Sequence, residues 1–285
     1  SNQPDRLPST WGWYPGRNAA SDLTVTDTTI QLVAGPRTNA WNGDVTAPHV
    51  DLPMTGNFSV QARFAFDTKD RWQEAGILIR PQSGPNRSID LRRSGAGPDE
   101  QRILAAATQN NDSNALIVVP YGKNVTYLNI VRRADQWAFR ASENGVNWFT
   151  LLDEQTFTMP DDVYISFFVV SSSQNGVLAD LSEIRIDRTP PEVTVPAYPD
   201  GAPLPSPQDE RALNPVWGWY PGLRPTSEYF LNAGAFTLVG APYTDLTHGT
   251  ITSPWVELPV SGNFTSQVHV RFTPVQRWQV SGYMF

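Results

Sequence analysis

One stretch of this chain occurs twice, and the repetition limits what the chain can fold into. The sequence Trp-Gly-Trp-Tyr-Pro-Gly stands at 11–16 and again at 217–222, exactly 206 residues later. Gly56-Asn57-Phe58 and Arg71-Trp72-Gln73 recur at the same spacing, without a gap between them. Of the 69 positions aligned in this way, 11–79 with 217–285, 26 are identical. We therefore interpret the chain as a tandem duplication of one folding unit.

This interpretation divides the chain into three parts. Residues 1–188 form one complete β-sandwich repeat, and residues 216–285 form the first part of a second repeat. The residues between them, 189–215, are rich in proline, which favours an extended, semi-rigid linker. Phe285 aligns with Ile79 of the first copy, so we expect the natural polypeptide to be longer.

Strands dominate the pattern of hydrophobic residues. Residues 58–66 alternate between apolar and other side chains over nine positions, which is typical of a strand with one buried face. We predict further strands at 76–80, 88–92, 102–107, 116–119, 126–132, 136–142, 148–151, 163–171 and 179–186. No segment has a sustained helical period. Many short strands separated by turn residues predict an all-β, antiparallel two-sheet sandwich.

One turn has a specific signature. Asn144-Gly145 lies between two predicted strands, and this dipeptide accepts the positive φ angles of a type I′ turn. We therefore expect a hairpin with a two-residue loop here.

The residues from Tyr127 to Leu152 resemble a known family. The run 127–133, followed by Asp135, Trp137, Asn144-Gly145 and Trp148, is similar to the concanavalin A-like lectin/glucanase β-sandwich modules appended to some bacterial β-xylosidases. Strands like 56–62, 73–80 and 179–186 also occur in those modules. The resemblance covers most of residues 50–187 and implies a jelly-roll fold, with a glycan-binding or accessory role. The Trp-Gly-Trp-Tyr-Pro-Gly segment has no counterpart in it that we can place.

The composition argues against several classes of function. The chain has no cysteine, three histidines and a net charge of −7, which disfavours thiolate chemistry, histidine-rich metal sites and a nucleic-acid-binding surface. No apolar run is long enough for membrane insertion. The close acidic pairs, such as Asp153-Glu154 and Asp161-Asp162, fall in predicted turns, and no strand carries alternating acids like a glucanase site. We therefore expect no enzyme and no cofactor, with a structural calcium ion left open.

The aromatic residues are the best candidates for a ligand site. Tryptophan packs on the apolar faces of sugars, while arginine and amide side chains bind the hydroxyl groups. We predict a glycan-binding site at Trp41, Arg71, Trp72 and Gln73, although Trp72 can equally well be a core residue. Trp41 is replaced by Thr247 in the second copy, whereas a residue required by the fold would be expected to recur. Trp137 and Trp148, which lie on predicted strands, are expected in the core.

Two function classes follow from these observations. The first is a secreted or cell-surface protein that binds carbohydrate or adheres, with repetition adding avidity. The second is a structural, self-associating filament or surface subunit, and an accessory module of a glycoside hydrolase is a weaker third. In the second reading the repeats pack through the linker and through the aromatic residues of the duplicated segments, which are Trp11, Trp13, Tyr14, Trp217, Trp219 and Tyr220.

Overall fold

The computed structural model describes residues 6–40, 45–84, 86–95, 100–189, 217–223, 227–232, 235–240 and 252–258, and the single positions 268, 270, 272, 281 and 282. Across these residues the regular structure consists of strands, and every pair of neighbouring strands is antiparallel. The predicted linker, 189–215, lies outside the described residues except for Thr189. The predicted fold class, an all-β antiparallel two-sheet sandwich, is confirmed.

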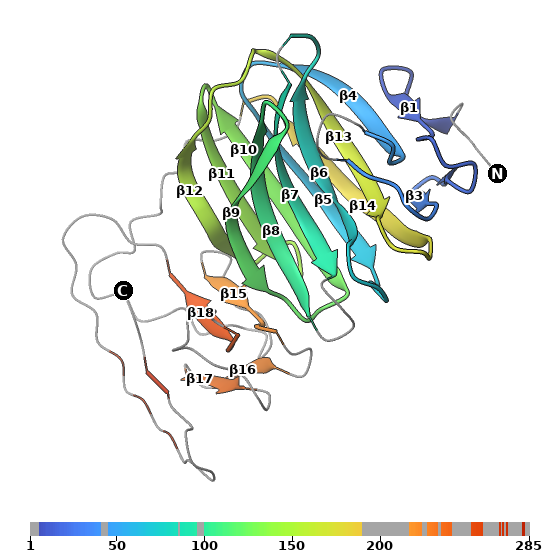
Figure 1. Ribbon diagram of the computed structural model, residues 1–285. Coiled ribbons are helices and arrows are strands. Elements are labelled where there is room, and N and C mark those ends of the chain that lie inside the picture. The colour runs from blue at the N-terminus through green and yellow to red at the C-terminus, as the bar shows by residue number, and fades with distance from the viewer. Residues whose placement is uncertain are drawn as a thin grey trace.

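Two seven-stranded sheets pack face to face (Figure 1). The first sheet contains, in spatial order, β1 (Gly12–Tyr14), β4 (His49–Thr55), β13 (Asp162–Ser171), β6 (Gln73–Pro81), β7 (Arg87–Gly95), β8 (Gln101–Gln109) and β9 (Asp112–Pro120). The second sheet contains β12 (Trp148–Thr156), β11 (Gln136–Ser142), β10 (Val125–Arg133), β5 (Phe58–Phe66), β14 (Val177–Asp187), β3 (Thr29–Ala34) and β2 (Asp22–Val25).

The core lies between the two sheets because one face of each strand is apolar. In β5 the five residues Phe58, Val60, Ala62, Phe64 and Phe66 are buried, and the residues between them are half-exposed. Phe167 on β13 and Leu91 on β7 are buried in the same cluster from the opposite sheet. The alternation that predicts β5 therefore also orients it, because a shift of one residue would expose the whole apolar face.

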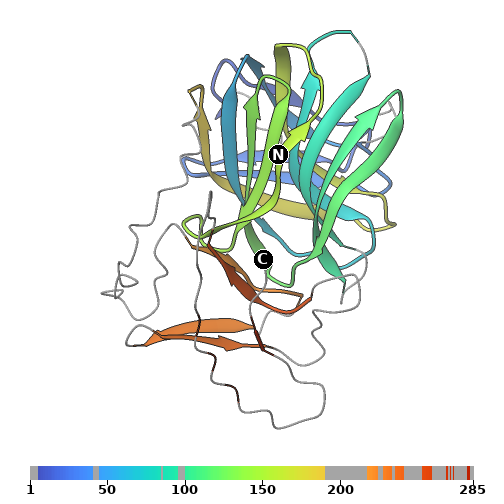
Figure 2. The same ribbon diagram turned by 90° about the vertical axis from the view of Figure 1, so that its left-hand side faces the viewer.

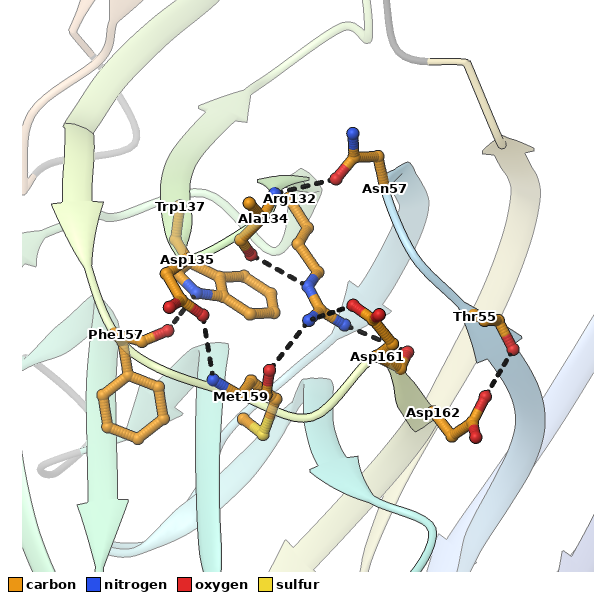
Figure 3. Close-up of polar contacts among 10 residues, drawn as sticks. All are labelled: Thr55, Asn57, Arg132, Ala134, Asp135, Trp137, Phe157, Met159, Asp161 and Asp162. Carbon is orange, nitrogen blue, oxygen red and sulfur yellow. Dashed lines mark hydrogen bonds and ion pairs between the residues drawn. The ribbon is translucent and has the colours of Figure 1, made fainter.

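Arg132 and Trp137, two of the residues that carry the family resemblance, lie in a polar cluster at one end of the second sheet (Figure 3). The Arg132 guanidinium is 1% exposed and donates hydrogen bonds to the backbone carbonyls of Ala134, Met159 and Asp161 at 3.1, 3.0 and 3.2 Å. Trp137 is fully buried, as expected, and its indole N–H donates to the carbonyl of Phe157 at 2.8 Å. These contacts hold the connection between β12 and β13 against the β10–β11 hairpin. The motif therefore stabilises the fold.

The hairpin at Asn144-Gly145 forms, but its loop is longer than predicted. Ser142 pairs with Trp148, so the loop has five residues, 143–147. Within this loop, only Gly145 has a positive φ, of 74°. The Asn144 side chain accepts hydrogen bonds from the backbone amides of Val146 and Asn147, both at 2.9 Å, and this replaces the predicted type I′ turn. The Asp153-Glu154 pair, expected in a turn, lies within β12.

Two smaller ladders lie at one end of the sandwich (Figures 1 and 2). One joins β15 (Gly218–Tyr220) to β18 (Trp255–Glu257), and the other joins β16 (Glu228–Asn232) to β17 (Ala235–Val239). Gly218 pairs with Glu257 just as Gly12 pairs with Asp51, and Glu228 pairs with Val239 just as Asp22 pairs with Val33. The strand registers thus repeat at the spacing found in the sequence.

Candidate functional site

The surface around Trp72 is the strongest candidate for a ligand site. Trp72 lies between β5 and β6, and its side chain is 44% exposed, one of the largest exposed apolar side chains among the described residues. Its φ is 64°, a left-handed conformation that is strained for a bulky residue. The backbone is fixed on both sides, because its N–H donates to the Gly95 carbonyl at 2.7 Å and its carbonyl accepts from Ser172 N–H at 3.1 Å. The fold therefore holds an aromatic ring in solvent at a local energetic cost.

Two arginines flank the indole of Trp72. The guanidinium carbon of Arg71 lies 4.8 Å from the ring centroid, and that of Arg102, on β8, lies 5.7 Å from it. Contacts of this kind are favourable because the cation lies over the electron-rich ring face. They place hydrogen-bond donors beside the apolar surface of the indole.

Polar groups continue from Trp72 into the neighbouring loop. A carboxylate oxygen of Asp70 accepts hydrogen bonds from the Asn175 amide at 2.7 Å and the Ser173 hydroxyl at 3.2 Å. We call Asp70, Arg71, Trp72, Arg102 and Asn175 the Trp72 rim. It combines an aromatic plane with donors and acceptors, which is the composition expected of a ligand site.

Of the four predicted ligand residues, the structure brings Arg71 and Trp72 together at the surface and buries Gln73. Gln73 is 1% exposed. Its side-chain oxygen accepts hydrogen bonds from the backbone amides of Lys69 and Asp70, and its side-chain nitrogen donates to the Gly176 carbonyl at 3.3 Å. It therefore positions the loop that carries Trp72. Trp41 lies outside the described residues.

A charged cluster that the sequence analysis missed lies on the outer face of the first sheet. Arg92 on β7 forms ion pairs with Asp90 on the same strand and with Glu74 on β6, the latter at 3.2 Å. Ser94 donates to Glu74 at 2.8 Å. Asp90 is fully buried, and one of its oxygens has no hydrogen-bond partner among the residues that the structure describes. Burial raises the pKa of its carboxyl to about 6.

A second charged group lies on the same face. The Asp51 carboxylate, on β4, accepts from Arg80 and from the Ser166 hydroxyl, each at 2.5 Å, and lies 3.5 Å from the His49 imidazole. Burial alone would raise the pKa of Asp51, but the contacts with His49, Arg80 and Ser166 hold it below its ordinary value. The sequence signal for the first cluster is the row of polar residues at alternate positions of the predicted strand 88–92, which are Ser88, Asp90 and Arg92.

The six aromatic residues predicted as interfaces fall into two environments. Trp11 and Trp13 are half-buried against the core of the first sandwich, and the Trp11 ring stacks on Phe167 with a centroid separation of 5.7 Å. Tyr14 is also half-buried, against His49. Trp219 is 2% exposed and Tyr220 is fully buried, whereas Trp217 is half-buried.

The described residues contain no group of three or more histidine or acidic side chains arranged to hold a metal ion. In the same part of the chain, no helix has the length and apolar character needed to cross a membrane.

The fold resembles sandwiches of known structure. A functionally unknown protein from Saccharomyces cerevisiae aligns over 63% of this chain and 97% of its own, with a TM-score of 0.53 and 14% identity. A bifunctional GH43-CE protein of Bacteroides eggerthii aligns over 66% of this chain, with a TM-score of 0.52 and 17% identity. The GH43 BlXynB protein from Bacillus licheniformis aligns over 65%, with a TM-score of 0.53 and 13% identity.

The match spans 25% of the Bacteroides eggerthii protein and 38% of the Bacillus licheniformis protein. At these identities the likeness concerns the fold alone. No family model matches the sequence, and a search of curated proteins found no relative.

Proposed function

We propose that this protein is a non-catalytic, secreted or cell-surface protein that binds carbohydrate through the Trp72 rim. The observation that carries the proposal is the exposed Trp72 indole, held at a positive φ by backbone hydrogen bonds on both sides. Strain of this kind is retained where the surrounding structure fixes it, and it clusters at binding sites.

The chemistry of the rim supports a sugar as the ligand. The indole offers a flat apolar surface for the C–H groups of a pyranose ring. Arg71, which is exposed beside it, can donate to hydroxyl groups, and the Asp70–Asn175 pair offers an acceptor and a donor nearby. Two of the proteins with a similar fold are GH43 proteins, which also supports a carbohydrate-related role.

The state of the acidic residues supports a non-catalytic role. A glycosidase needs two carboxyl groups that reach opposite sides of a glycosidic bond. Glu74 and Asp90 are 3% and 0% exposed, and both are paired with Arg92. In this arrangement Arg92 stabilises both carboxylates, and their burial keeps a polysaccharide chain from reaching them.

The test is depletion of the protein by insoluble xylan, cellulose and chitin at neutral pH. We expect the wild-type protein to bind at least one of them and Trp72→Ala to bind about tenfold more weakly, or about 1.4 kcal/mol. Leu178→Ala is the matched control, because Leu178 is 41% exposed on the other sheet. Equal binding by the wild type and Trp72→Ala, with both folded, would show that the Trp72 rim does not bind the polysaccharide.

The second candidate is a structural protein that assembles through its repeats. It is favoured by one observation, the burial of Tyr220 where β15 meets the first sandwich. Negative-stain electron microscopy distinguishes the two functions. Ordered fibres at neutral pH would favour assembly, whereas separate particles of one size would favour the binding protein.

A further inference from the structure

The β15–β18 ladder has two distinct faces. Trp219 and Val256 pair with each other and pack with Leu231 of β16 in a small cluster. The flanking residues Gly218 and Tyr220 point the other way, as expected for a strand, and meet the first sandwich. The β15–β18 ladder thus packs on the β16–β17 hairpin with one face and contacts the first sandwich with the other.

This division matches the first copy. There Trp13 and Val50 pair and pack toward the sandwich core, whereas Gly12 lies on the outward face. The docked face of the β15–β18 ladder therefore corresponds to the outward face of the β1–β4 ladder in the first copy. Trp219 and Val256 lie on the opposite, inward face, where they pack with Leu231.

The apolar part of the contact centres on Tyr220. Its ring lies 5.1 Å from that of Phe149 in an edge-on arrangement and 3.7 Å from that of Trp255. Its hydroxyl donates to the backbone carbonyl of Pro120. Tyr220 is fully buried and belongs to the same core cluster as Phe149 of the first sandwich.

Directional polar contacts surround this centre. The Glu257 carboxylate accepts from the backbone N–H of Thr150 at 2.6 Å, and Gly122 N–H donates to the Gly222 carbonyl at 3.0 Å. The bond between Gly122 and Gly222 uses backbone groups on both sides, and such groups need a hydrogen-bond partner where they are buried.

The loop of the β11–β12 hairpin also contributes to the surface of the first sandwich that contacts the second ladder. Glu143 accepts from the Trp219 indole N–H at 2.9 Å and lies 3.4 Å from the Lys123 ammonium. The Asn147 amide donates to the Trp217 carbonyl at 3.1 Å. The five-residue loop that the sequence analysis did not predict therefore presents both side chains to the second ladder.

Two residues distinguish the docked ladder from its counterpart. His49 and Asp51 of the first ladder correspond to Trp255 and Glu257 of the second. Trp255 adds an aromatic surface against Tyr220, and Glu257 has the extra methylene with which it reaches Thr150. In the first ladder, Asp51 is instead paired with Arg80 of its own sheet.

We propose that the outward face of the β15–β18 ladder is a docking surface for the β11–β12 end of the first sandwich, and that it fixes successive repeats in one head-to-tail orientation. The partner is the neighbouring repeat of this chain, and Trp255 and Glu257 adapt the second ladder to it. The two repeats then keep one fixed orientation relative to each other. This proposal is independent of carbohydrate binding.

The test compares equivalent glycines in the full chain by hydrogen–deuterium exchange. A Cβ atom at Gly218 would lie 2.4 Å from the Trp148 carbonyl oxygen, whereas one at Gly12 would have no neighbour closer than 3.9 Å. Gly218→Val should therefore release the ladder and raise exchange at the Gly122 and Thr150 amides at least tenfold. Gly12→Val should leave both amides protected. Equal protection in the two variants would overturn the proposal.

A second variant guards against misfolding of Gly218→Val. Glu257→Ala removes the acceptor for the Thr150 N–H and for the Trp255 indole N–H, and it leaves the first sandwich intact. We expect faster exchange at Thr150 and a larger maximum dimension in small-angle X-ray scattering. Unchanged exchange and unchanged dimensions in Glu257→Ala would show that the repeats do not depend on this contact for their orientation.

Discussion

The backbone N–H of Trp72 donates to the carbonyl of Gly95 at 2.7 Å, so the last residue of β7 fixes the residue that precedes β6. These strands are neighbours in the first sheet, and the bond fixes the backbone of Trp72 at the point where β6 begins. Gly95 is suited to this position, because a Cβ atom there would lie 2.7 Å from Cβ of Thr68. The exposure of Trp72 is therefore a consequence of the strand pairing around it.

The first prediction concerns the strain at Trp72. Glycine adopts a positive φ without the steric cost of a Cβ atom, so Trp72→Gly should be about 1 kcal/mol more stable than Trp72→Ala. Urea unfolding of the two variants measures the difference. Both variants should lose carbohydrate binding alike, since both lack the indole. If alanine were the more stable of the two, the left-handed conformation would not describe this residue in solution.

The second prediction concerns Asp90. Its pKa is raised to about 6 in the folded protein, so the folded state holds the proton more tightly than the unfolded chain. The raised pKa therefore contributes its full stabilisation below about pH 4, the ordinary pKa of an aspartate in the unfolded chain. This stabilisation is lost as the pH rises through 6. Asp90→Asn cannot ionise, so its stability relative to the wild type should increase from pH 4 to pH 7. Thermal unfolding across this range tests it, and parallel curves for the two proteins would refute it.

The third prediction concerns the cluster in Figure 3. Arg132→Met keeps much of the side-chain volume but removes the donor to the backbone carbonyls of Ala134, Asp161 and Met159, of which Met159 is buried. We expect a loss of about 3 kcal/mol in the free energy of unfolding. Arg185→Met, at an exposed position of β14, should change it by no more than about 0.5 kcal/mol. Equal effects of the two substitutions would contradict a structural role for Arg132.

The sequence predicts the long strands well because their alternation reflects a buried face. β5 and β11 begin and end as predicted, whereas β1, β2, β3 and β4 were not predicted. These four strands are three to seven residues long and contain proline or polar residues, so local pattern alone does not define them. They form because neighbouring strands pair with them.

The candidate site was predicted only in part, for a related reason. The recurrence of Arg71-Trp72-Gln73 identified the loop, but a positive φ at Trp72 separates an exposed indole from a buried Gln73, and this angle cannot be read from the sequence. Glu74 and Asp90 lie on different strands, so a pattern of alternating acids on one strand does not reveal them. They come together only through the pairing of β6 with β7 and through Arg92 between them.

The central claim, that Trp72 contacts carbohydrate, is tested most directly by fluorine NMR of the protein labelled with fluorotryptophan. The Trp72 resonance is assigned from its absence in Trp72→Phe, and the buried Trp137 serves as an internal reference. On addition of soluble fragments of the polysaccharide that depletes the protein, we predict a shift of the Trp72 resonance and none of the Trp137 resonance. A Trp72 resonance that stays in place while the fragments bind would contradict the account.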